Sequence, residues 1–397
     1  MRRGRRGEEL GVSLERRITL RGVGGQPVLD GEGKGTVLDL RAGGVVIENL
    51  ACRNSGKSGS AFELWGDAGI AVHGDRATIS KVRVTGNDWG VLFFERTGSV
   101  LEYAEISDNE NDGVRIMRGR NHRIAGCSVN RSGTGISFDA LYPDRDAPIM
   151  GFGNPVTAKD FVEKKARSIL SQENVVRENE LAGNAFYGIV VTGESHHNKV
   201  EGNRVFRTGK ERLVTRNAIT ANRVCATRIG LLLISADENR LTRNRVADHS
   251  EFGVRIGLDD LFKQASIGNL VAVNFLTGNP VNAHDSSGRL LTAPDLEGLI
   301  DRLSLPQEIK RQMARNPAMR AQMLKAYLTN LTPGTNQWDD GTLGNHDDDF
   351  DAREEGFVDG DSNGIPEGGK PIPGGPAVDY HSLGAALAES RLEREAP

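Results

Sequence analysis

The chain has 397 residues, a net charge of −4, 37% hydrophobic and 5% aromatic residues, and 49 glycines. This composition is typical of a turn-rich β protein and excludes a helical bundle. Residues 339–367 hold eleven acids and one arginine, a net of −10, so the remainder sums to +6. Seven arginines and three glutamates in the first 21 residues supply +4 of that sum. The nearly neutral middle lacks the basic stripe expected of a nucleic-acid-binding protein.

The N-terminal segment MRRGRRGEELGV has the basic start of a signal peptide but lacks the apolar stretch that should follow it. We therefore recognise no signal peptide in this chain. No segment approaches the ~20 apolar residues that span a bilayer, so we expect no membrane span. Three scattered cysteines are too few for a disulfide framework or a zinc knuckle.

A repeat of about 22 residues organises the next part of the chain. A glycine followed by an aliphatic residue marks short strands at Gly69, Gly90, Gly113, Gly135, Gly188, Gly230 and Gly253. A second motif, N-x-φ-x-x-N-x-φ with φ aliphatic, begins at Asn174, Asn198, Asn217, Asn239 and Asn269. Asparagine suits the bends because it tolerates the left-handed conformation and its amide can bond to the next asparagine.

These repeats predict an all-β fold, a right-handed parallel β-helix of the pectin-lyase type over residues 1–288. A single turn of such a helix, a rung, cannot bury its own inward residues, so stacked rungs make the core. About ten rungs at ~4.8 Å each give a rod roughly 45–50 Å long. A β-sandwich has similar strand spacing but gives no reason for a fixed asparagine column. Cys52 and Cys127 align with inward positions, so we expect both to be small core residues.

One outer face of this rod carries the candidate binding residues. Residues two and four places after each glycine should point outward, because side chains alternate along a strand. The resulting substrate-groove candidates are His73, Phe94, Arg115 and Asp139, with Tyr142 and Arg145 of the following segment as a wall. An aromatic platform, a guanidinium and a carboxylate near a histidine suit a sugar chain. The alternative is an ordinary mixed surface.

Further along the same face, the outward positions become apolar at Val190, Leu232 and Ile234. Such a patch should not face water. We expect the helical insertion or the C-terminal tail to cover it.

Two insertions interrupt the repeat. The first, near residues 141–171, begins with loop chemistry and continues with a helix-like pattern. The second, residues 289–335, has helical patterning throughout, and Asn316 followed by Pro317 predicts a helix start. Three of the six methionines lie in this second insertion. A helix pair packed on the rod explains them more simply than a partner-binding or copper-binding surface.

Residues 336–397 form an acidic C-terminal segment that we expect to close the rod and to end in a helix. Its loop DGDSNGIPE carries the candidate calcium ligands Asp359, Asp361, Asn363 and Glu367. Alternating oxygen donors followed by Gly364 resemble a calcium loop, although Lys370 stands where a calcium loop has its last glutamate. A structural Ca²⁺ and a solvated acidic turn remain alternatives.

The repeats and the C-terminal region resemble the NosD-type right-handed β-helix family, whose repeat is also grouped with carbohydrate-binding and sugar-hydrolase β-helices. The resemblance rests on residues 18–56, on the asparagine-rich rungs, and on a closing signature. The signature has three parts. The first, N-x-W-D-x-G-x-x-G-N-Y-W-S-D-Y, corresponds to residues 336–350. The second, D-x-D-G-D-G-I, corresponds to residues 359–365, and the third, P-I-P-G-G, to residues 371–375. Here His346, Asp347 and Asp348 replace Tyr-Trp-Ser, and the second insertion splits the signature from residues 279–288.

The resemblance implies a periplasmic or secreted protein. Because the chain begins partway into the family's first rung, we expect its natural start to lie further upstream. For the family's namesake the resemblance implies an accessory role in copper delivery, yet the only histidine pair is His196 and His197, so we expect no copper cofactor. The catalytic signatures of polygalacturonases and mannuronan epimerases are absent.

We therefore expect an exported protein that binds or modifies a polysaccharide, with uronate-containing glycans as the suggested partners. An enzyme of this kind would be a lyase, an epimerase or a glycoside hydrolase. Arg115 or His73 could remove a proton next to a uronate, whereas hydrolysis needs two facing carboxylates. The alternative function is a non-catalytic, NosD-like scaffold in metal delivery or surface interaction. The sequence gives no oligomeric state.

Overall fold

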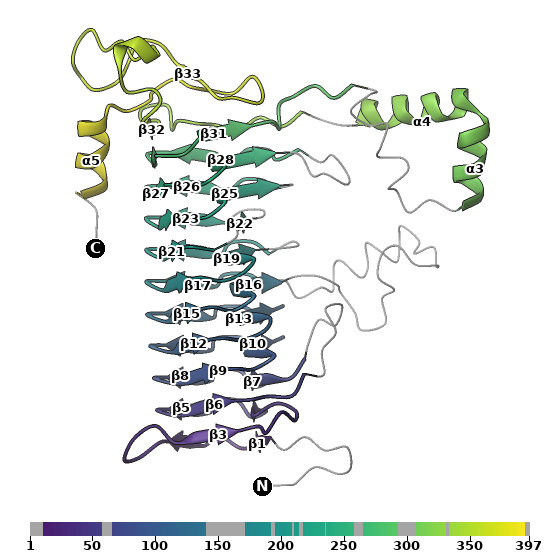
Figure 1. Cartoon of the computed structure of the whole chain (residues 1–397), viewed down its shortest axis with the longest axis vertical. Coiled ribbons are helices and arrows are strands. Elements are labelled where there is room, and N and C mark those ends of the chain that lie inside the picture. Colours follow the sequence, from purple (N-terminus) through teal and green to yellow (C-terminus); the bar gives the residue numbers. More distant parts are fainter. Residues whose placement is uncertain are drawn as a thin grey trace.

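The computed structural model describes residues 11–57, 66–139, 171–191, 195–208, 210–213, 217–234, 236–257, 265–292, 307–330 and 333–393. Within these residues the chain coils into a rod of short parallel strands (Figure 1). Three parallel sheets run along the rod, and each rung gives one strand to each of them. Over the described part of the chain two sheets have eleven strands and the third has ten, which confirms the predicted β-helix of about ten rungs.

Sheet A contains the longest strands. They are β1 (Val12–Leu14), β4 (Leu38–Leu40), β7 (Ala68–Val72), β10 (Trp89–Phe94), β13 (Asp112–Met117), β16 (Thr134–Asp139), β19 (Tyr187–Val191), β22 (Lys210–Leu213), β25 (Ile229–Ile234), β28 (Phe252–Gly257) and β31 (Val281–Asp285).

Sheets B and C consist almost entirely of three-residue strands. Sheet B has β2 (Thr19–Arg21), β5 (Val46–Glu48), β8 (Thr78–Ser80), β11 (Val100–Glu102), β14 (Arg123–Ala125), β17 (Val175–Arg177), β20 (Lys199–Glu201), β23 (Ala218–Thr220), β26 (Arg240–Thr242) and β29 (Leu270–Ala272). Sheet C has β3 (Val28–Asp30), β6 (Ala51–Arg53), β9 (Arg83–Thr85), β12 (Glu105–Ser107), β15 (Ser128–Asn130), β18 (Glu180–Ala182), β21 (Arg204–Phe206), β24 (Arg223–Cys225), β27 (Arg245–Ala247), β30 (Phe275–Thr277) and β32 (His346–Asp347).

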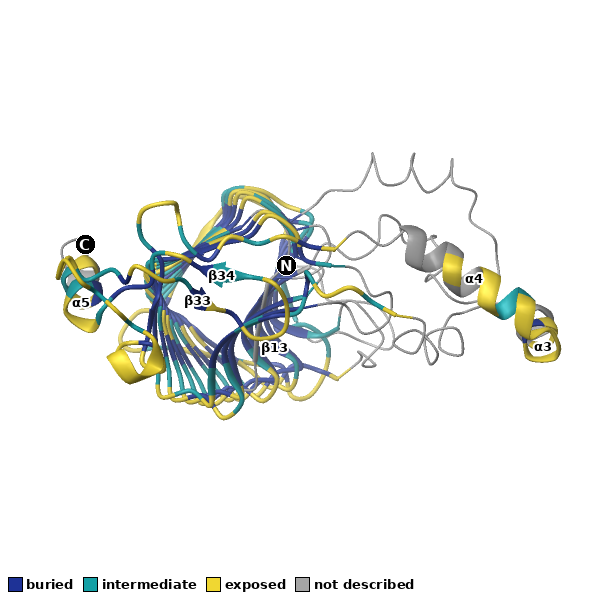
Figure 2. Ribbon diagram, turned by 90° about the horizontal axis from the view of Figure 1, so that it is seen from above, coloured by how far each residue is buried: buried dark blue, intermediate teal, exposed yellow. Residues whose placement is uncertain are grey.

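Stacked aliphatic columns fill the rod. The middle residue of each short strand points inward and lies opposite the middle residue of the next rung, as Ile79 does opposite Leu101. Seen from above, the buried residues follow the strands and the exposed residues gather at the bends (Figure 2). Cys52 lies opposite Val84 and is fully buried, and Cys127 is only 2% exposed. Burial raises the pKa of these two thiols to about 12 and about 11 respectively, so both stay protonated core residues.

Two ladders of buried asparagine side chains hold the bends of the upper rungs. The first ladder is Asn174, Asn198, Asn217, Asn239, Asn269 and Asn336; the second is Asn179, Asn203, Asn222, Asn244, Asn274 and Asn345. In each step the backbone N–H and the side-chain amide of one asparagine donate to the Oδ1 of the next, as Asn203 does to Asn222 at 3.0 Å. The two asparagines of the repeat motif therefore belong to two different ladders.

Both insertions leave the stack of rungs intact. Sheet B continues across the first one, because β14 pairs directly with β17; residues 140–170 lie outside the described part of the chain. The second insertion contains α3 (Gln307–Arg315) and α4 (Pro317–Asn330). Asn316 caps α4 as predicted, with its Oδ1 accepting the N–H of Met319 at 3.1 Å. The two helices stand off to the side of the rod (Figures 1 and 2), whereas we expected a pair packed on it.

The acidic segment closes the rod. Asn336 and Asn345 end the two ladders, and Trp338, 1% exposed, joins the core above Val271. The Trp338 Nε1–H donates to Asp285, a residue from the other side of the second insertion, at 3.2 Å. The remaining elements are the helical turn η1 (Arg353–Glu355), the hairpin strands β33 (Lys370–Pro371) and β34 (Val378–Asp379), and the predicted terminal helix, α5 (Ala385–Glu393).

Candidate functional site

The structure brings two of the predicted binding residues together. His73 follows β7, Phe94 ends β10 on the next rung, and their ring centroids lie 5.7 Å apart. Both side chains are half-buried on the outer side of sheet A. Asp139 ends β16 opposite Met117, but its side chain is not among those described. Tyr142 and Arg145 lie outside the described residues.

Arg115 belongs to a neighbouring group of side chains, which we call the sheet A cluster: Trp89, Asp112, Arg115 and Ser137. The Arg115 guanidinium stacks over the Trp89 ring at 4.6 Å and lies 3.4 Å from the Asp112 carboxylate. The Ser137 hydroxyl donates to the same carboxylate. The Arg115 side chain is only 13% exposed, so it holds this cluster together and presents little of itself to solvent.

The prediction that side chains alternate strictly between inward and outward positions did not identify Trp89 and Asp112 as outward residues. The alternation breaks at the glycine that follows each of them. A Cβ built on Gly113 would point inward and meet the Val129 Cγ1 at 2.4 Å, so the corner has room for glycine only. Two consecutive residues, Gly113 and Val114, therefore face the core. The residue before the glycine then returns to the outside, and Thr134 and Tyr187 continue this column on the next two rungs.

The bend beyond Phe94 supplies further functional groups that the sequence did not single out. The Arg118 guanidinium, from the bend after β13, lies over the Phe94 ring at 5.6 Å and pairs with Glu95. Asp39 lies 3.8 Å from His73 Nε2 and pairs with Arg41 at 2.6 Å. We call the set Arg41, His73, Phe94, Arg96 and Arg118 the sheet A corner.

Arg96, like Arg41, is an exposed member of this corner. It is close enough to His73 to lower the pKa of the imidazole, and no ion pair joins its guanidinium to any residue in the described part of the chain. Burial is the main cause that lowers the pKa of His73; Asp39 opposes it, and Arg41 adds to it. The His73 ring is therefore neutral near pH 7 and can accept a proton.

The apolar zone further up sheet A is shielded from water. Val190 is 6% and Leu232 is 7% exposed, while Ile234 is half-buried. The terminal helix packs elsewhere, with Ala388 against Phe275 of sheet C. Neighbouring segments such as 258–264 lie outside the described residues.

The candidate calcium ligands mostly bond to their own loop. Asp359 and Asp361 both accept the backbone N–H of Asn363, at 3.1 and 3.2 Å, and Glu367 accepts that of Gly360 at 2.6 Å. Nowhere in the described ranges do three or more His, Cys, Asp or Glu side chains group closely enough to hold a metal ion. In this geometry the three carboxylates do not meet at one point, and calcium binding here stays a prediction.

The acids that replace the family's aromatic closure have a structural role. Asp347 points inward at the end of the Leu276 column and is 1% exposed. Burial raises the pKa of its carboxyl, while Lys370, 3.2 Å away, lowers it. Lys370 also pairs with Asp349, so one buried lysine offsets two carboxylates. The lysine that breaks the calcium pattern is thus the partner of Asp347, which replaces an aromatic residue of the closing signature, and of Asp349, which the signature shares.

His196 and His197, the only adjacent histidines, point their Nδ1 atoms at each other at 2.8 Å. This distance is that of a hydrogen bond between the rings. A metal would need further ligands, and the described residues bring no third His, Cys or carboxylate to this pair.

Comparison with known proteins identifies the repeats. Residues 162–293 match the family model described as periplasmic copper-binding protein (NosD), and residues 28–144 match the right handed beta helix region. No curated protein matches the chain. No helix within the described residues is long and apolar enough to cross a membrane.

Solved structures with a similar trace share little sequence with this chain. The Dettilon tailspike protein is 13% identical with a TM-score of 0.45, over 67% of this chain and 60% of the tailspike. A mutant of the periplasmic alginate epimerase AlgG is 14% identical with a TM-score of 0.44, over 69% of this chain and 75% of the epimerase. The catalytic domain of an α-1,3-glucanase is 10% identical with a TM-score of 0.42, over 68% of this chain and 58% of the glucanase.

The assignment of the fold rests on the strand register and on the two family matches. The matches cover rungs on both sides of the first insertion, and the closing segment completes the same ladders and columns. The chain is a right-handed parallel β-helix protein, and its residues 162–293 resemble the NosD family.

Proposed function

We propose that this chain is an exported protein that binds an acidic polysaccharide at the sheet A corner. The observation that carries the proposal is the Phe94 ring, which has His73 beside it at 5.7 Å and Arg118 over it at 5.6 Å, next to the exposed Arg96. A periplasmic location is the one that the matched family description implies.

The chemistry of the corner suits a uronate. The apolar face of a sugar ring can pack on Phe94, while a guanidinium binds a carboxylate through two parallel hydrogen bonds. Arg96 has no competing carboxylate among the described residues and is exposed, so it can make such a contact without first losing an ion pair. The sheet A cluster beside it, with Arg115 locked onto Trp89 and Asp112, gives the corner a rigid support.

Binding of polygalacturonate by the purified protein tests the proposal. Arg96→Ala should weaken binding roughly tenfold, the usual worth of a charge-assisted hydrogen bond, and Phe94→Ala should weaken it as well. Arg83→Ala and Tyr103→Ala are matched controls, because each removes an exposed side chain of the same type from another face. Equal binding by the Arg96 and Arg83 variants, or equal binding of neutral dextran by the wild type, would refute the proposal.

Among the modifying reactions, proton abstraction next to a uronate carboxylate fits the corner best. A neutral His73 can take the proton from the carbon next to the carboxylate, while Arg96 stabilises the charge that develops there. In a lyase the glycosidic bond then breaks, its oxygen takes a proton from water, and a carbon–carbon double bond forms. We expect the wild-type protein to release a product that absorbs ultraviolet light through that double bond. His73→Ala should lose this product and still bind polygalacturonate. If the wild type releases no such product, the protein binds the polysaccharide without cleaving it.

The second candidate function is a copper-delivery accessory, favoured by the match to the periplasmic copper-binding family and by the facing His196 and His197. Copper binding in solution that disappears in the His196→Ala, His197→Ala double variant would support it. Copper binding unchanged by that substitution would exclude this pair as the site.

A further inference from the structure

Three arginines stack on the outer side of sheet C, on consecutive rungs. Arg204 of β21 lies opposite Arg223 of β24, which lies opposite Arg245 of β27. We call these three residues the arginine ladder. In-register rungs place neighbouring Cα atoms about 4.8 Å apart, so the ladder presents like charges in a row along the rod axis. Like charges directly opposite each other on neighbouring strands destabilise a sheet.

Earlier rungs of the same column avoid this arrangement. Arg83 lies opposite Glu105, and their side chains pair at 3.0 Å. Two columns away, Arg53 pairs across the rungs with Asp30 at 2.8 Å. The alternation of charge on these rungs is the ordinary way in which a solvated sheet face satisfies its arginines.

The ladder is only partly neutralised. Arg204 at its lower end pairs with Glu180 at 3.3 Å, and Arg245 at its upper end stacks on the Phe275 ring at 4.7 Å. Arg223 in the middle is exposed, and no carboxylate of the described residues lies within ion-pair distance of it. Arg207, in the bend after β21, adds a further exposed guanidinium.

We propose that the arginine ladder is a second anion-binding surface, which takes an acidic polysaccharide lying along the rod axis. Carboxylate or sulfate groups on successive sugar units would replace the missing counter-charges of Arg223 and its neighbours. Half-buried Phe206 lies in the next outward column and gives the sugar rings an apolar contact.

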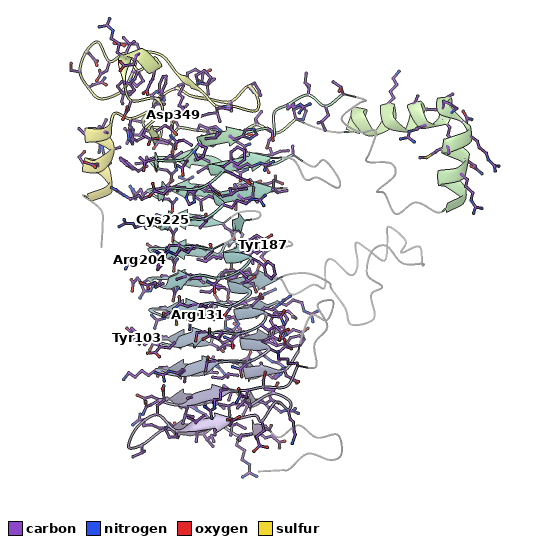
Figure 3. The ribbon with its side chains drawn as sticks, in the orientation of Figure 1. Tyr103, Arg131, Tyr187, Arg204, Cys225 and Asp349 are labelled. Carbon is purple, nitrogen blue, oxygen red and sulfur yellow. The ribbon has the colours of Figure 1, made fainter. Side chains whose placement is uncertain are left out.

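This surface is distinct from the sheet A corner. Arg204 and Cys225 lie along one edge of the rod and Tyr187 of sheet A lies toward the other (Figure 3). A polymer bound at one surface therefore does not occupy the other, and the two proposals can fail separately. A polysaccharide fits the ladder better than a nucleic acid, because the chain as a whole has a net charge of −4 and its ladder is only three residues long.

The test uses the full chain and a short oligogalacturonide, with binding sites counted by titration calorimetry at low salt. Arg223→Ala should remove one class of site, or weaken it about tenfold, and leave the class that Arg96→Ala removes. Arg83→Ala is the matched control, because it removes an arginine from the same column whose charge is already paired. Neutral dextran and a single-stranded oligonucleotide are the comparison ligands.

A second measurement separates binding from structure. Arg223→Glu replaces the central like charge with an opposite one, so it should raise Tm in plain buffer while it abolishes binding at the ladder. A variant that merely misfolds would lower Tm, and Arg223→Gln then takes its place in the titration. The proposal is overturned if Arg223→Ala binds as wild type does, if dextran binds equally well, or if the oligonucleotide binds and the oligogalacturonide does not.

Discussion

The lower and upper rungs of this rod have the same three sheets but use their polar side chains differently. The lower rungs pair opposite charges across the outer faces, at Arg21–Glu48, Arg53–Asp30, Arg83–Glu105, Arg123–Glu102 and Arg131–Asp108. The upper rungs carry the continuous asparagine ladders inside and place arginine on arginine in one outward column of sheet C. Exposed ion pairs contribute little to stability, whereas buried, fully bonded amides fix the register. An internal ladder thus leaves the outer face available for a ligand.

The largest effect should come from the closure of the upper rungs. Trp338→Ala removes a large side chain that is 1% exposed and ends the core. Its expected cost is about 3–5 kcal/mol in the free energy of unfolding. Amide exchange should rise first in β29, β30 and β32 and leave β5 to β12 protected, because rungs stabilise only their neighbours. Tyr380→Ala, an exposed aromatic in the same segment, is the control; uniform opening of the whole rod would contradict the idea of a local cap.

An interruption of the internal ladder should cost somewhat less. In Asn222→Ala the amide and backbone N–H of Asn203 lose their acceptor, and Asn244 loses a donor. Buried groups left unbonded cost about 1–3 kcal/mol each, so we expect roughly 3 kcal/mol in denaturant unfolding. Thr242→Ala, on the outside of the neighbouring rung, should stay within about 0.5 kcal/mol. Similar losses for both variants would mean that the ladder adds nothing beyond ordinary packing.

The C-terminal segment that closes the rod should also contribute less to the free energy of unfolding as pH rises. Burial raises the pKa of Asp379 from 3.8 to about 8; the negative charge of Asp347 adds to this effect, and N–H groups of Asn345 and His381 oppose it. Between these two pKa values the folded state holds a proton that the unfolded state has released, so the free energy of unfolding falls as pH increases. We expect a loss of up to about 2 kcal/mol between about pH 6 and pH 8.

Urea denaturation at the two pH values measures this dependence. Asp379→Asn should flatten it, while Asp361→Asn, which changes an exposed acid of the same segment, should not. Stability that rises over this range would show that the hydrogen bonds to the Asp379 carboxylate outweigh its burial.

The smallest effect on stability should come from a substitution that gives the lower rungs the stacked arginines of the upper rungs. Glu105→Arg replaces the partner of Arg83 with a like charge on the next rung. The expected cost is about 0.2–1 kcal/mol, together with a gain in oligogalacturonide binding. Glu105→Gln, which removes the pair without adding a charge, should show a smaller cost and no gain. Binding that stays unchanged in Glu105→Arg would mean that stacked arginines alone do not make an anion site.

The interior of the rod could be predicted closely, and the candidate site only in part. The pairing of Cys52 with Val84 and the role of the paired asparagines follow from the repeat period alone. His73 and Phe94 were placed together correctly by counting from glycine. Counting failed for Trp89 and Asp112, because the alternation breaks at the glycine that follows each of them; at Gly113 two successive residues turn inward. Arg96 and Arg118 lie in a bend where no alternation applies.

The sequence by itself determined the repeat, the stacking of parallel rungs, the two insertions and the role of residues 336–350 as the end of the rod. These follow from local periodicity, because each rung meets only its neighbours and repeats their pattern. Only the tertiary structure decided which charges meet: Lys370 with Asp347 and Asp349 across the closure, Arg118 over Phe94, and Arg223 between two further arginines. Such contacts join residues that are far apart in sequence, and their energies depend on burial and distance, which the sequence does not encode locally.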